Sequence, residues 1–346
     1  MTDRQALYFL EPHQVEVRKE SLPAPGQGQV LVKTAVSAIS SGTEMLFYRG
    51  QVPQDLAIDS SIAGMESTFS YPLKYGYAAV GRVIALGRDV DKGWLGRRVF
   101  SFHPHESYFT TATTHLQPIP DGLPMETAVL LPFMETAVSF LMDGQPVIGE
   151  KVAILGQGIV GLLTTALLAG YPLTNLVTLD RFPLRRDWST RLGAQCALDP
   201  HGEETQTRLR SIFEMDSLYS GADLVFELTG NPQVLNQAIA LAGYDGRVLI
   251  GSWYGKKQAA LDLGGQFHRA HIQLISSQVS TIAPRWRGRF DHARRLQTAW
   301  SRLAQHQPQR LITHRFVLDQ AAEAYRMLDQ NPEVAIQVVF TYEDGS

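Results

Sequence analysis

Three glycines and one carboxylate predict the clearest chemistry in this sequence. The glycines lie in a turn, residues 156–161, that follows an apolar run at 152–155 and precedes a helix-compatible segment at 162–169. A strand, a G-x-G-x-x-G turn and a helix form a dinucleotide-binding fingerprint. Its glycines permit the tight turn, close approach of the backbone to a pyrophosphate, and close helix–strand packing, and the helix N-terminus attracts the phosphates. The residues expected to hold the phosphates are Gly156, Gln157, Gly158, Ile159, Val160 and Gly161.

The carboxylate is Asp180, which ends the next apolar run at 176–179 and lies 24 residues after Gly156. This spacing is near that of the acid that binds an adenosine ribose. A 2′-phosphate about 4 Å away would be repelled by roughly 4 kcal/mol at an effective dielectric near 20. We therefore expect NAD, with NADP as the alternative because Arg181 is able to accommodate the phosphate.

The apolar stretch at 152–170 is long enough to cross a membrane. However, it contains four glycines and Gln157, and it leads to a second strand that ends in an acid. These features favour a nucleotide site over a membrane span.

Composition sets the broad class of the protein. Its 346 residues, 44% hydrophobic and 19% charged, predict two domains. A net charge of −3 indicates no broad surface for nucleic acid. The first twelve residues show no signal peptide, and the single Cys196 fits a reducing compartment. We therefore expect a cytoplasmic protein that acts on a small molecule, with no nucleic-acid or membrane partner.

The first 140 residues contain short strand-like runs separated by prolines and glycines. The expected strands are residues 5–10, 15–19, 29–38, 77–86 and 98–102. Residues 50–71 lack periodicity and are expected to form a long loop that shapes a pocket. A helical pattern follows at 125–141.

From residue 152 strands and helices alternate, which indicates a doubly wound parallel sheet. The expected strands are 152–155, 176–179, 224–228, 247–251 and 271–276, and the expected helices are 160–169, 183–192, 203–213 and 233–242. A helix at 290–304, a strand at 312–318, a helix at 319–328 with Asp319 as its N-cap, and a strand at 334–340 complete the chain.

Several segments together resemble the medium-chain dehydrogenase/reductase, or alcohol dehydrogenase-like, superfamily. The first is AISSGTE at 38–44 with YRG at 48–50, which is similar to G-I-C-G-T-D followed by Y-x-G. The others are GYAAVGRV at 76–83, GRRV at 96–99, ELTG at 227–230, GRV at 246–248 with Gly251, and 312–325 near the C-terminus. Their order and spacing cover nearly the whole chain.

The resemblance implies an α/β fold of two domains. A GroES-like β-barrel catalytic domain would take residues 1–140, a Rossmann domain with a doubly wound parallel sheet residues 141–284, and a C-terminal segment, 285–346, would return to the catalytic domain. It also implies homodimers or homotetramers formed through the last Rossmann strands, near residues 272–276. By the same analogy Thr229, Gly230 and Ser252, which follow strand ends, are expected to contact the cofactor.

The chain departs from the superfamily where zinc would bind. Ser41 stands at the position of the cysteine ligand, Tyr77 at that of the histidine, and Ala78 at that of the glutamate. Zinc prefers thiolate, imidazole or carboxylate ligands, so the chain resembles a zinc-independent branch. The SGTE segment at 41–44 resembles the subgroup that includes the bacteriochlorophyllide hydroxyethyl dehydrogenases.

One metal site remains an alternative. His103 and His105 would face one side of a straight strand, and Glu44, Glu66 or Glu135 would complete the ligand set. The competing interpretation is that both histidines form hydrogen bonds or face solvent.

Without zinc, a hydrogen-bond donor must stabilise charge on the substrate oxygen. Tyr77 is the first candidate donor, and the competing role is to fill the space of the metal. The other catalytic candidates are Ser41, Thr43, Glu44, His105 and His103, each of which could equally be structural. The aromatic residues expected near the site are Phe69, Tyr71, Phe102, Tyr108, Trp253, Tyr254 and Trp286.

These features predict a zinc-independent NAD(P)(H)-dependent oxidoreductase that acts on an alcohol/carbonyl pair of a bulky or aromatic substrate. The alternatives are a reductase of enones or quinones and a nucleotide-binding structural or regulatory protein without redox turnover.

Overall fold

The chain forms two compact units in a computed structural model that describes residues 3–53, 68–217 and 220–342. Unit 1 is Met1–Pro132 with Leu303–Ser346, and unit 2 is Phe133–Arg302. The first division falls within helix α3 (Leu131–Gly144) and the second within helix α9 (His292–His306). In the described part of the chain no helix has the length and apolar character needed to cross a membrane.

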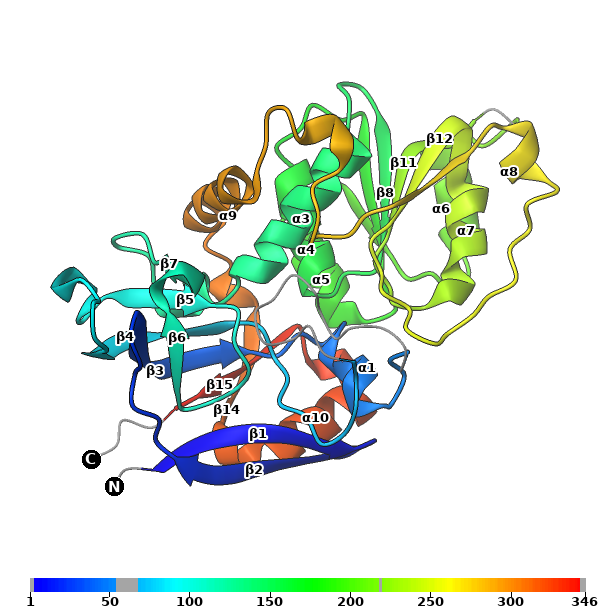
Figure 1. The fold of residues 1–346 in the computed structure, drawn as a ribbon. Coiled ribbons are helices and arrows are strands. Elements are labelled where there is room, and N and C mark those ends of the chain that lie inside the picture. Colours follow the sequence, from blue (N-terminus) through cyan, green and yellow to red (C-terminus); the bar gives the residue numbers. More distant parts are fainter. Residues whose placement is uncertain (1–2, 54–67, 218–219, 343–346) are drawn as a thin grey trace. The chain divides into compact units, whose positions relative to one another are not determined.

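Unit 1 is built on a seven-stranded sheet whose long central strand is β3 (Gln29–Ala38). The other strands are β4 (Ala79–Leu86), β5 (Arg98–Ser101), β6 (Tyr108–Ala112), β7 (Leu116–Pro118), β14 (Ile312–Val317) and β15 (Gln337–Thr341). Strand β15, from the end of the chain, pairs antiparallel with β3 and parallel with β14 (Figure 1). The C-terminal segment therefore completes this sheet.

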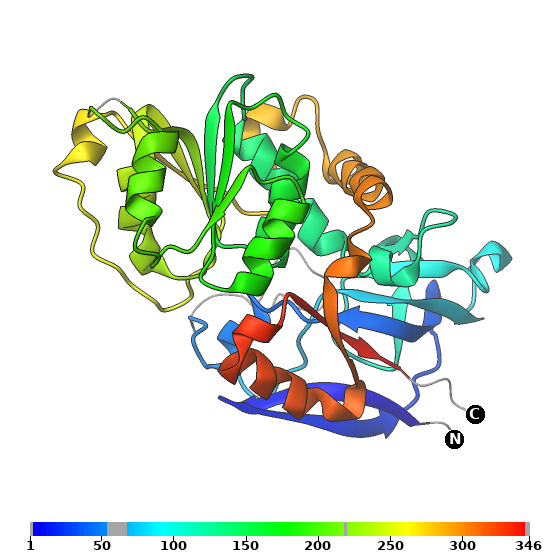
Figure 2. The same ribbon diagram turned by 180° about the vertical axis from the view of Figure 1, so that it is seen from behind.

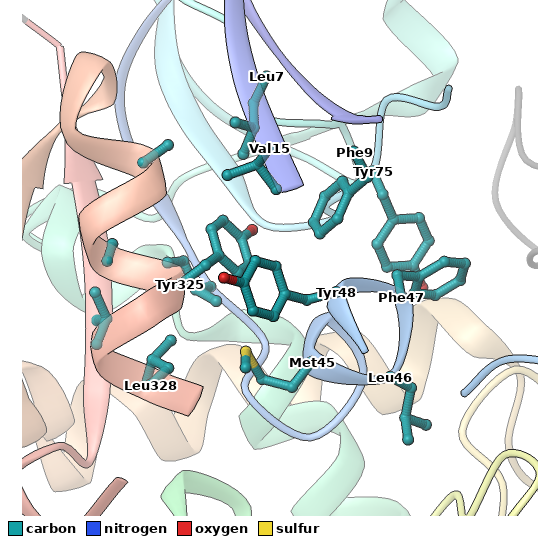
Figure 3. Close-up of a cluster of buried hydrophobic side chains, with 14 of the residues drawn as sticks. Leu7, Phe9, Val15, Met45, Leu46, Phe47, Tyr48, Tyr75, Tyr325 and Leu328 are labelled. Atoms are coloured by element: carbon teal, nitrogen blue, oxygen red, sulfur yellow. The ribbon is translucent and has the colours of Figure 1, made fainter. Parts of the chain in front are cut away.

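A separate hairpin in unit 1, β1 (Asp3–Glu11) and β2 (Gln14–Ser21), packs over helices α1 (Glu44–Tyr48) and α10 (Ala321–Gln330). Aromatic rings form the centre of this core. Phe9 meets Tyr325 edge to face with 5.2 Å between ring centroids, and Tyr48 stacks on Tyr325 at 5.5 Å (Figure 3). This core therefore ties α1 to the C-terminal helix.

Ion pairs also join the hairpin to the rest of unit 1. Lys74 Nζ lies 2.8 Å from Glu20 Oε2 and 2.8 Å from Glu106 Oε1. Arg4 contacts the same two carboxylates at 2.6 and 2.9 Å. The side chain of Glu106 is 4% exposed, so these partners stabilise a buried charge.

Unit 2 contains a six-stranded parallel sheet in the order β10-β9-β8-β11-β12-β13. Its strands are β8 (Lys151–Leu155), β9 (Asn175–Leu179), β10 (Cys196–Leu198), β11 (Ala222–Glu227), β12 (Ala242–Ile250) and β13 (Gln273–Ser276). The main helices between them are α4 (Ile159–Leu168), α5 (Pro183–Arg191), α6 (Thr205–Ile212) and α7 (Leu235–Leu241). This strand order is that of a doubly wound dinucleotide-binding sheet.

Helices cover both faces of this sheet (Figures 1 and 2). In β8, Ala153 and Leu155 pack in the core that contains Leu209 of α6 and Ile239 of α7. Successive side chains of a strand point to opposite faces. Val152 and Ile154 accordingly lie in the core formed with α3 and α4. Burial on both faces explains the unbroken apolar run in the sequence.

The α/β fold class is confirmed, and several local expectations are wrong. The expected helix at 125–141 is divided into α2 (Met125–Ala128) and α3. Gln320, not Asp319, occupies the N-cap position of α10, and no side chain caps this helix end. Asp319 lies in a 3-10 turn, where its carboxylate accepts a hydrogen bond from Gln5. Three short strands, β6, β7 and β10, escaped prediction because each has too few residues to show alternation.

Glu20 gives the hairpin contact a predictable dependence on pH. Burial raises the pKa of Glu20, but hydrogen bonds from Lys74, Tyr8 and Arg4 outweigh burial and lower that pKa to about 2. A carboxyl whose folded pKa is depressed stabilises the fold above its unfolded pKa and loses that effect as the pH falls toward the folded value. The free energy of unfolding of unit 1 should therefore fall between about pH 4.5 and pH 2.

The variant Glu20→Gln should lower the free energy of unfolding at pH 7 by about 1–2 kcal/mol and should flatten its decline below pH 4.5. Urea unfolding at pH 7 and pH 3 measures both effects. Glu16→Gln is the matched control, since Glu16 pairs with Arg18 in solvent, where both side chains are more than 40% exposed. Equal acid slopes in wild type and Glu20→Gln would contradict this account.

Candidate active site

The glycine turn lies between the ends of β8 and α4, and each of its glycines meets a different constraint. Gly156 has φ +95°, and a Cβ there would lie 2.6 Å from the carbonyl oxygen of Leu228. A Cβ on Gly161 would lie 2.1 Å from the carbonyl oxygen of Gly156. A Cβ on Gly158 would meet nothing within 4 Å. Packing thus requires glycine at positions 156 and 161. At Gly158 the space beside the backbone is empty and leaves room for a ligand.

Gly158 is also the N-cap of α4, and no side chain caps this helix end. The first N–H groups of a helix have no partner within the helix, and the end of the helix dipole is positive. The backbone N–H groups beside the opening at Gly158 are therefore suited to bind an anion.

The other turn residues face the interior of unit 2. The Gln157 side chain is fully buried, where its Oε1 accepts a hydrogen bond from Thr165 at 2.8 Å and its Nε2 donates to the Gly156 carbonyl at 3.1 Å. Ile159 is buried, and Val160 is half-buried against the α3 core. Their side chains support the turn, so contacts from these residues to a ligand would come from the backbone.

Asp180 lies at the end of β9, where it is 8% exposed. Its Oδ2 accepts a hydrogen bond from the Gln157 N–H at 2.8 Å, and its Oδ1 accepts one from the Phe182 N–H at 2.9 Å. Each carboxylate oxygen is able to accept a further hydrogen bond. Asp180 therefore holds the glycine turn and keeps acceptor capacity for a ribose hydroxyl.

Two arginines flank this carboxylate and rest on one aromatic ring. The guanidinium of Arg181 lies 4.5 Å from the ring centre of Phe182, and that of Arg185 lies 4.8 Å from it. Arg185 Nη1 is 4.0 Å from Asp180 Oδ2. These cations partly offset the negative charge that Asp180 presents.

A second loop follows β11, the strand beside β8. In an open α/β sheet the ligand crevice lies where the strand order reverses, and β8 and β11 form that point here. The buried carboxylate of Glu227 accepts hydrogen bonds from the Thr229 N–H at 2.8 Å and from the Tyr254 hydroxyl. Burial, together with the negative charge of Glu227, raises the pKa of Tyr254, so this phenol stays a donor.

Gly230 and Ser252 join the same loop. The Gly230 N–H donates to Ser252 Oγ at 2.9 Å, and Lys257 Nζ donates to the Gly230 carbonyl at 2.6 Å. The structure thus brings Thr229, Gly230 and Ser252 together near the ends of β8 and β11, at the switch point where the strand order reverses. Sequence analysis missed Glu227, Tyr254 and Lys257 as supports, although an acid at a buried strand end was a signal that could have found Glu227.

Unit 1 gathers hydroxyl groups where sequence analysis expected the catalytic group. The Tyr77 hydroxyl donates to Ser40 Oγ and lies 3.4 Å from Thr43 Oγ1. Tyr77, Ser41 and Thr43 are half-buried, so their side chains are partly accessible. Hydroxyls in contact exchange donor and acceptor roles easily, which lets this group meet either an alcohol or a carbonyl oxygen.

Glu44 and His105 lie beneath that group and have no exposed surface. His105 Nε2 lies 3.0 Å from Glu44 Oε2 and Nδ1 lies 2.6 Å from Ser37 Oγ. A Cβ on Gly76 would lie 2.7 Å from the His105 ring, so the ring fits only beside a glycine. Both side chains are engaged in buried hydrogen bonds, as the structural interpretation of these residues expects, and their catalytic role stays a prediction.

His103 takes no part in this group. Its ring stacks on Phe109 with 4.0 Å between centroids, and Nε2 lies 3.3 Å from Glu106. Residues 102–105 form no strand, so the condition under which both histidines would face one side is not met. Glu135 forms a buried ion pair with Arg295 in unit 2, and Glu66 lies outside the described residues.

Among the residues that the structure describes, no three His, Cys, Asp or Glu side chains are grouped so as to hold a metal ion.

Comparison with known proteins identifies the family. The family model described as glucose dehydrogenase C-terminus matches residues 142–338, which is more than half of the chain. The chain belongs to this family. It is a member of the medium-chain, zinc-type alcohol dehydrogenase-like superfamily, as the sequence motifs predict. The zinc-independent branch and the bacteriochlorophyllide dehydrogenase subgroup are finer assignments that these matches leave open.

One curated relative and two solved structures illustrate what the chain is similar to. D-guloside 3-dehydrogenase of Escherichia coli K12 is 23% identical, over 91% of this chain and 93% of its own. The structure of rspB, an alcohol dehydrogenase from E. coli CFT073 in complex with NADH, is 18% identical with a TM-score of 0.78 and covers 99% of this chain and 100% of that one. A putative zinc-binding dehydrogenase from Sinorhizobium meliloti bound to NADP is 20% identical with a TM-score of 0.76, over 99% and 100%. The fold is therefore the expected pairing of a GroES-like domain with a Rossmann domain.

The three glycines predict contrasting effects of substitution. Gly158→Val fills open space, so it should cost about 1 kcal/mol of stability or less, through the poorer N-cap, while weakening NADH binding at least tenfold, which corresponds to about 1.4 kcal/mol or more. Gly161→Ala forces a backbone clash and should destabilise unit 2 by about 1–3 kcal/mol. Calorimetric binding and thermal unfolding measure both effects.

Gly288→Val is the control for Gly158→Val, because a Cβ at Gly288 also meets nothing within 4 Å but lies outside the turn. It should bind NADH as the wild type does. Wild-type affinity in Gly158→Val would show that the opening at Gly158 does not hold the dinucleotide.

Proposed function

We propose that the chain is an NAD(P)(H)-dependent oxidoreductase that interconverts a secondary alcohol and a ketone without zinc. The observation that carries this proposal is the opening at Gly158, because a backbone anion site at the switch point of the sheet suits a pyrophosphate. A bound nicotinamide dinucleotide would supply the hydride acceptor or donor. The chain's own residues would hold the cofactor and stabilise charge on the substrate oxygen.

The cofactor that we propose is NAD. Asp180 has both oxygens engaged by backbone N–H groups, which fixes the position of the carboxylate. A fixed negative charge at this place disfavours a 2′-phosphate. Arg181 and Arg185 reduce that repulsion, so NADPH is expected to bind more weakly rather than to be rejected.

Zinc does not fit the residues at the positions where the superfamily has ligands. Tyr77 and Ser41 carry neutral hydroxyls, Ala78 carries no donor, and the Tyr77 hydroxyl is hydrogen-bonded to Ser40. Zinc sites in proteins are built from thiolate, imidazole and carboxylate ligands. The reaction that we propose therefore uses no metal.

Tyr77 is the group that we propose takes over the role of the metal. As a phenol it would donate a hydrogen bond to a carbonyl oxygen on which negative charge develops during hydride addition. The phenol has a single proton, which it donates to Ser40 Oγ in the free protein. With substrate bound, Tyr77 would turn this proton to the substrate oxygen and would accept a hydrogen bond from the Ser40 or Thr43 hydroxyl in its place. During reduction the product oxygen would take a proton that solvent replaces at the half-buried Tyr77, and during oxidation the proton of the alcohol would pass to solvent by the same route.

The substrate class that we propose is a secondary alcohol on a bulky or aromatic molecule. Aromatic rings adjoin Tyr77 within unit 1: Tyr75 lies 6.2 Å away between centroids, and Phe47 and Phe69 follow it. Of the aromatic candidates, Phe69 is buried in this core, while Tyr71 remains half-buried. The relative D-guloside 3-dehydrogenase favours a ring polyol as the second candidate.

We also propose that the protein is a cytoplasmic homodimer or homotetramer joined through β13, without nucleic-acid or membrane partners. Strand β13 forms the edge of the six-stranded sheet, and its Leu274 and Ile275 are only partly buried. An edge strand with unpaired backbone groups is a template for pairing with a second copy.

The proposal predicts NADH oxidation by a panel of aryl ketones and oxidised ring polyols. In Tyr77→Phe, kcat should fall roughly a hundredfold, because the oxygen loses its donor, while the Kd for NADH stays unchanged. Steady-state kinetics with NADH and with NADPH, and product analysis, measure these quantities. Tyr171→Phe, a solvent-exposed phenol in unit 2, is the control and should match the wild type.

Two other outcomes would replace the proposal. Conversion of an enone to a saturated ketone, without alcohol formation, would indicate a double-bond reductase. Tight NADH binding without hydride transfer to any ketone, quinone or enone would indicate a nucleotide-binding protein without redox turnover.

A further inference from the structure

A buried hydrogen-bonded network lies beneath Tyr77 and extends into the C-terminal segment. Glu44 Oε2 accepts hydrogen bonds from the Tyr325 hydroxyl and from His105, and Glu44 Oε1 accepts one from the Ser40 N–H at 2.8 Å. Glu44, His105 and Tyr325 have no exposed surface. Three hydrogen bonds thus fix the carboxylate. Oε2 binds Tyr325 of α10 and His105, and Oε1 binds the backbone of the turn at residues 40–44, called here the Ser40 turn.

The direction of the hydrogen bonds is set by the chemistry of the groups. A carboxylate only accepts, so His105 must carry a proton on Nε2. On the other side of the ring, His105 Nδ1 lies 2.6 Å from Ser37 Oγ, which lies 2.7 Å from the Tyr342 hydroxyl. Burial and the Glu44 charge raise the pKa of Tyr325, which keeps this phenol protonated. Glu44 therefore accepts hydrogen bonds from Tyr325, from His105 and from the Ser40 N–H.

The Ser40 turn links Glu44 to Tyr77. The backbone N–H groups of Thr43 and Glu44 donate to the Ser40 carbonyl at 3.1 and 2.7 Å, and the Glu44 carboxylate accepts the Ser40 N–H. This closed turn fixes the Ser40 hydroxyl, to which Tyr77 is hydrogen-bonded. The link passes through a backbone amide, which cannot relay a proton, so the network positions Tyr77 and does not feed it.

We propose that Tyr325 is a positioning residue for the reaction. Its hydroxyl, with His105, fixes the rotation of the Glu44 carboxylate, and the carboxylate in turn fixes the Ser40 turn that holds the Tyr77 hydroxyl. This inference rests on the proposed function in one respect, namely that Tyr77 contacts the substrate oxygen. It explains why helix α10, far along the sequence, packs on α1 (Figure 3).

A double-mutant cycle between Tyr325→Phe and Tyr77→Phe tests the proposal, since coupled residues give non-additive effects. Tyr325→Phe alone should lower kcat roughly tenfold, because a misplaced group loses catalytic effect steeply with distance, and should leave the KM for NADH unchanged. In the Tyr77→Phe background the same substitution should change kcat less than about twofold. Additive losses would overturn the proposal.

Tyr48→Phe is the matched control. Tyr48 stacks on Tyr325 in the same core (Figure 3), but its hydroxyl is not part of the network described above. It should keep wild-type kcat. Should Tyr325→Phe fail to fold, Glu44→Gln replaces it, with the same expected non-additivity with Tyr77→Phe. A kcat in Tyr325→Phe equal to that of Tyr48→Phe would also overturn the proposal.

Crystal structures of wild type and Tyr325→Phe separate this inference from the proposed function. The inference predicts that the Ser40 turn shifts and that the hydrogen bond between Tyr77 and Ser40 is lost. An unchanged turn would overturn the inference whatever the activity. Wild-type kcat in Tyr77→Phe would overturn the proposed role of Tyr77, and the two crystal structures would still decide the role of Tyr325.

Discussion

A carboxylate removed from water must be hydrogen-bonded or paired, or it is strongly destabilising. Three such carboxylates determine the shape of the polar regions in this protein. Asp180 holds the glycine turn through the Gln157 N–H, Glu227 holds the loop after β11 through Thr229 and Tyr254, and Glu44 holds the Ser40 turn. Each acid fixes a loop whose backbone or hydroxyl groups face outward. Rigid loops of this kind are what a preorganised site needs.

The two units present different chemical groups on these loops. Unit 2 offers backbone N–H groups and an opening at Gly158, which suit an anionic dinucleotide. Unit 1 offers neutral hydroxyls around Tyr77, which suit an oxygen that gains or loses a proton. In the superfamily that this chain resembles, zinc performs the second task. Here hydroxyls stand at the ligand positions, and we propose that Tyr77 performs that task.

Much of unit 2 could be predicted from the sequence, because a buried parallel strand, a glycine turn and a helix leave a local signal. The turn, Asp180 and five of the six strands are examples. Unit 1 was harder to predict, since its contacts join distant residues. Tyr325 reaches Glu44 across 281 positions of sequence, and no local pattern marks such a pair. The burial of His105 could not be predicted either. The ring fits because residue 76 is a glycine, and the sequence shows this glycine only as part of a family motif.

Metal content measured together with turnover tests the central claim most directly. The full-length protein, purified without a metal-binding tag, should contain far less than one zinc per chain by mass spectrometry. It should keep its kcat with NADH and an accepted ketone after treatment with a strong chelator. Stoichiometric zinc, with activity lost on chelation and restored by zinc, would contradict the account.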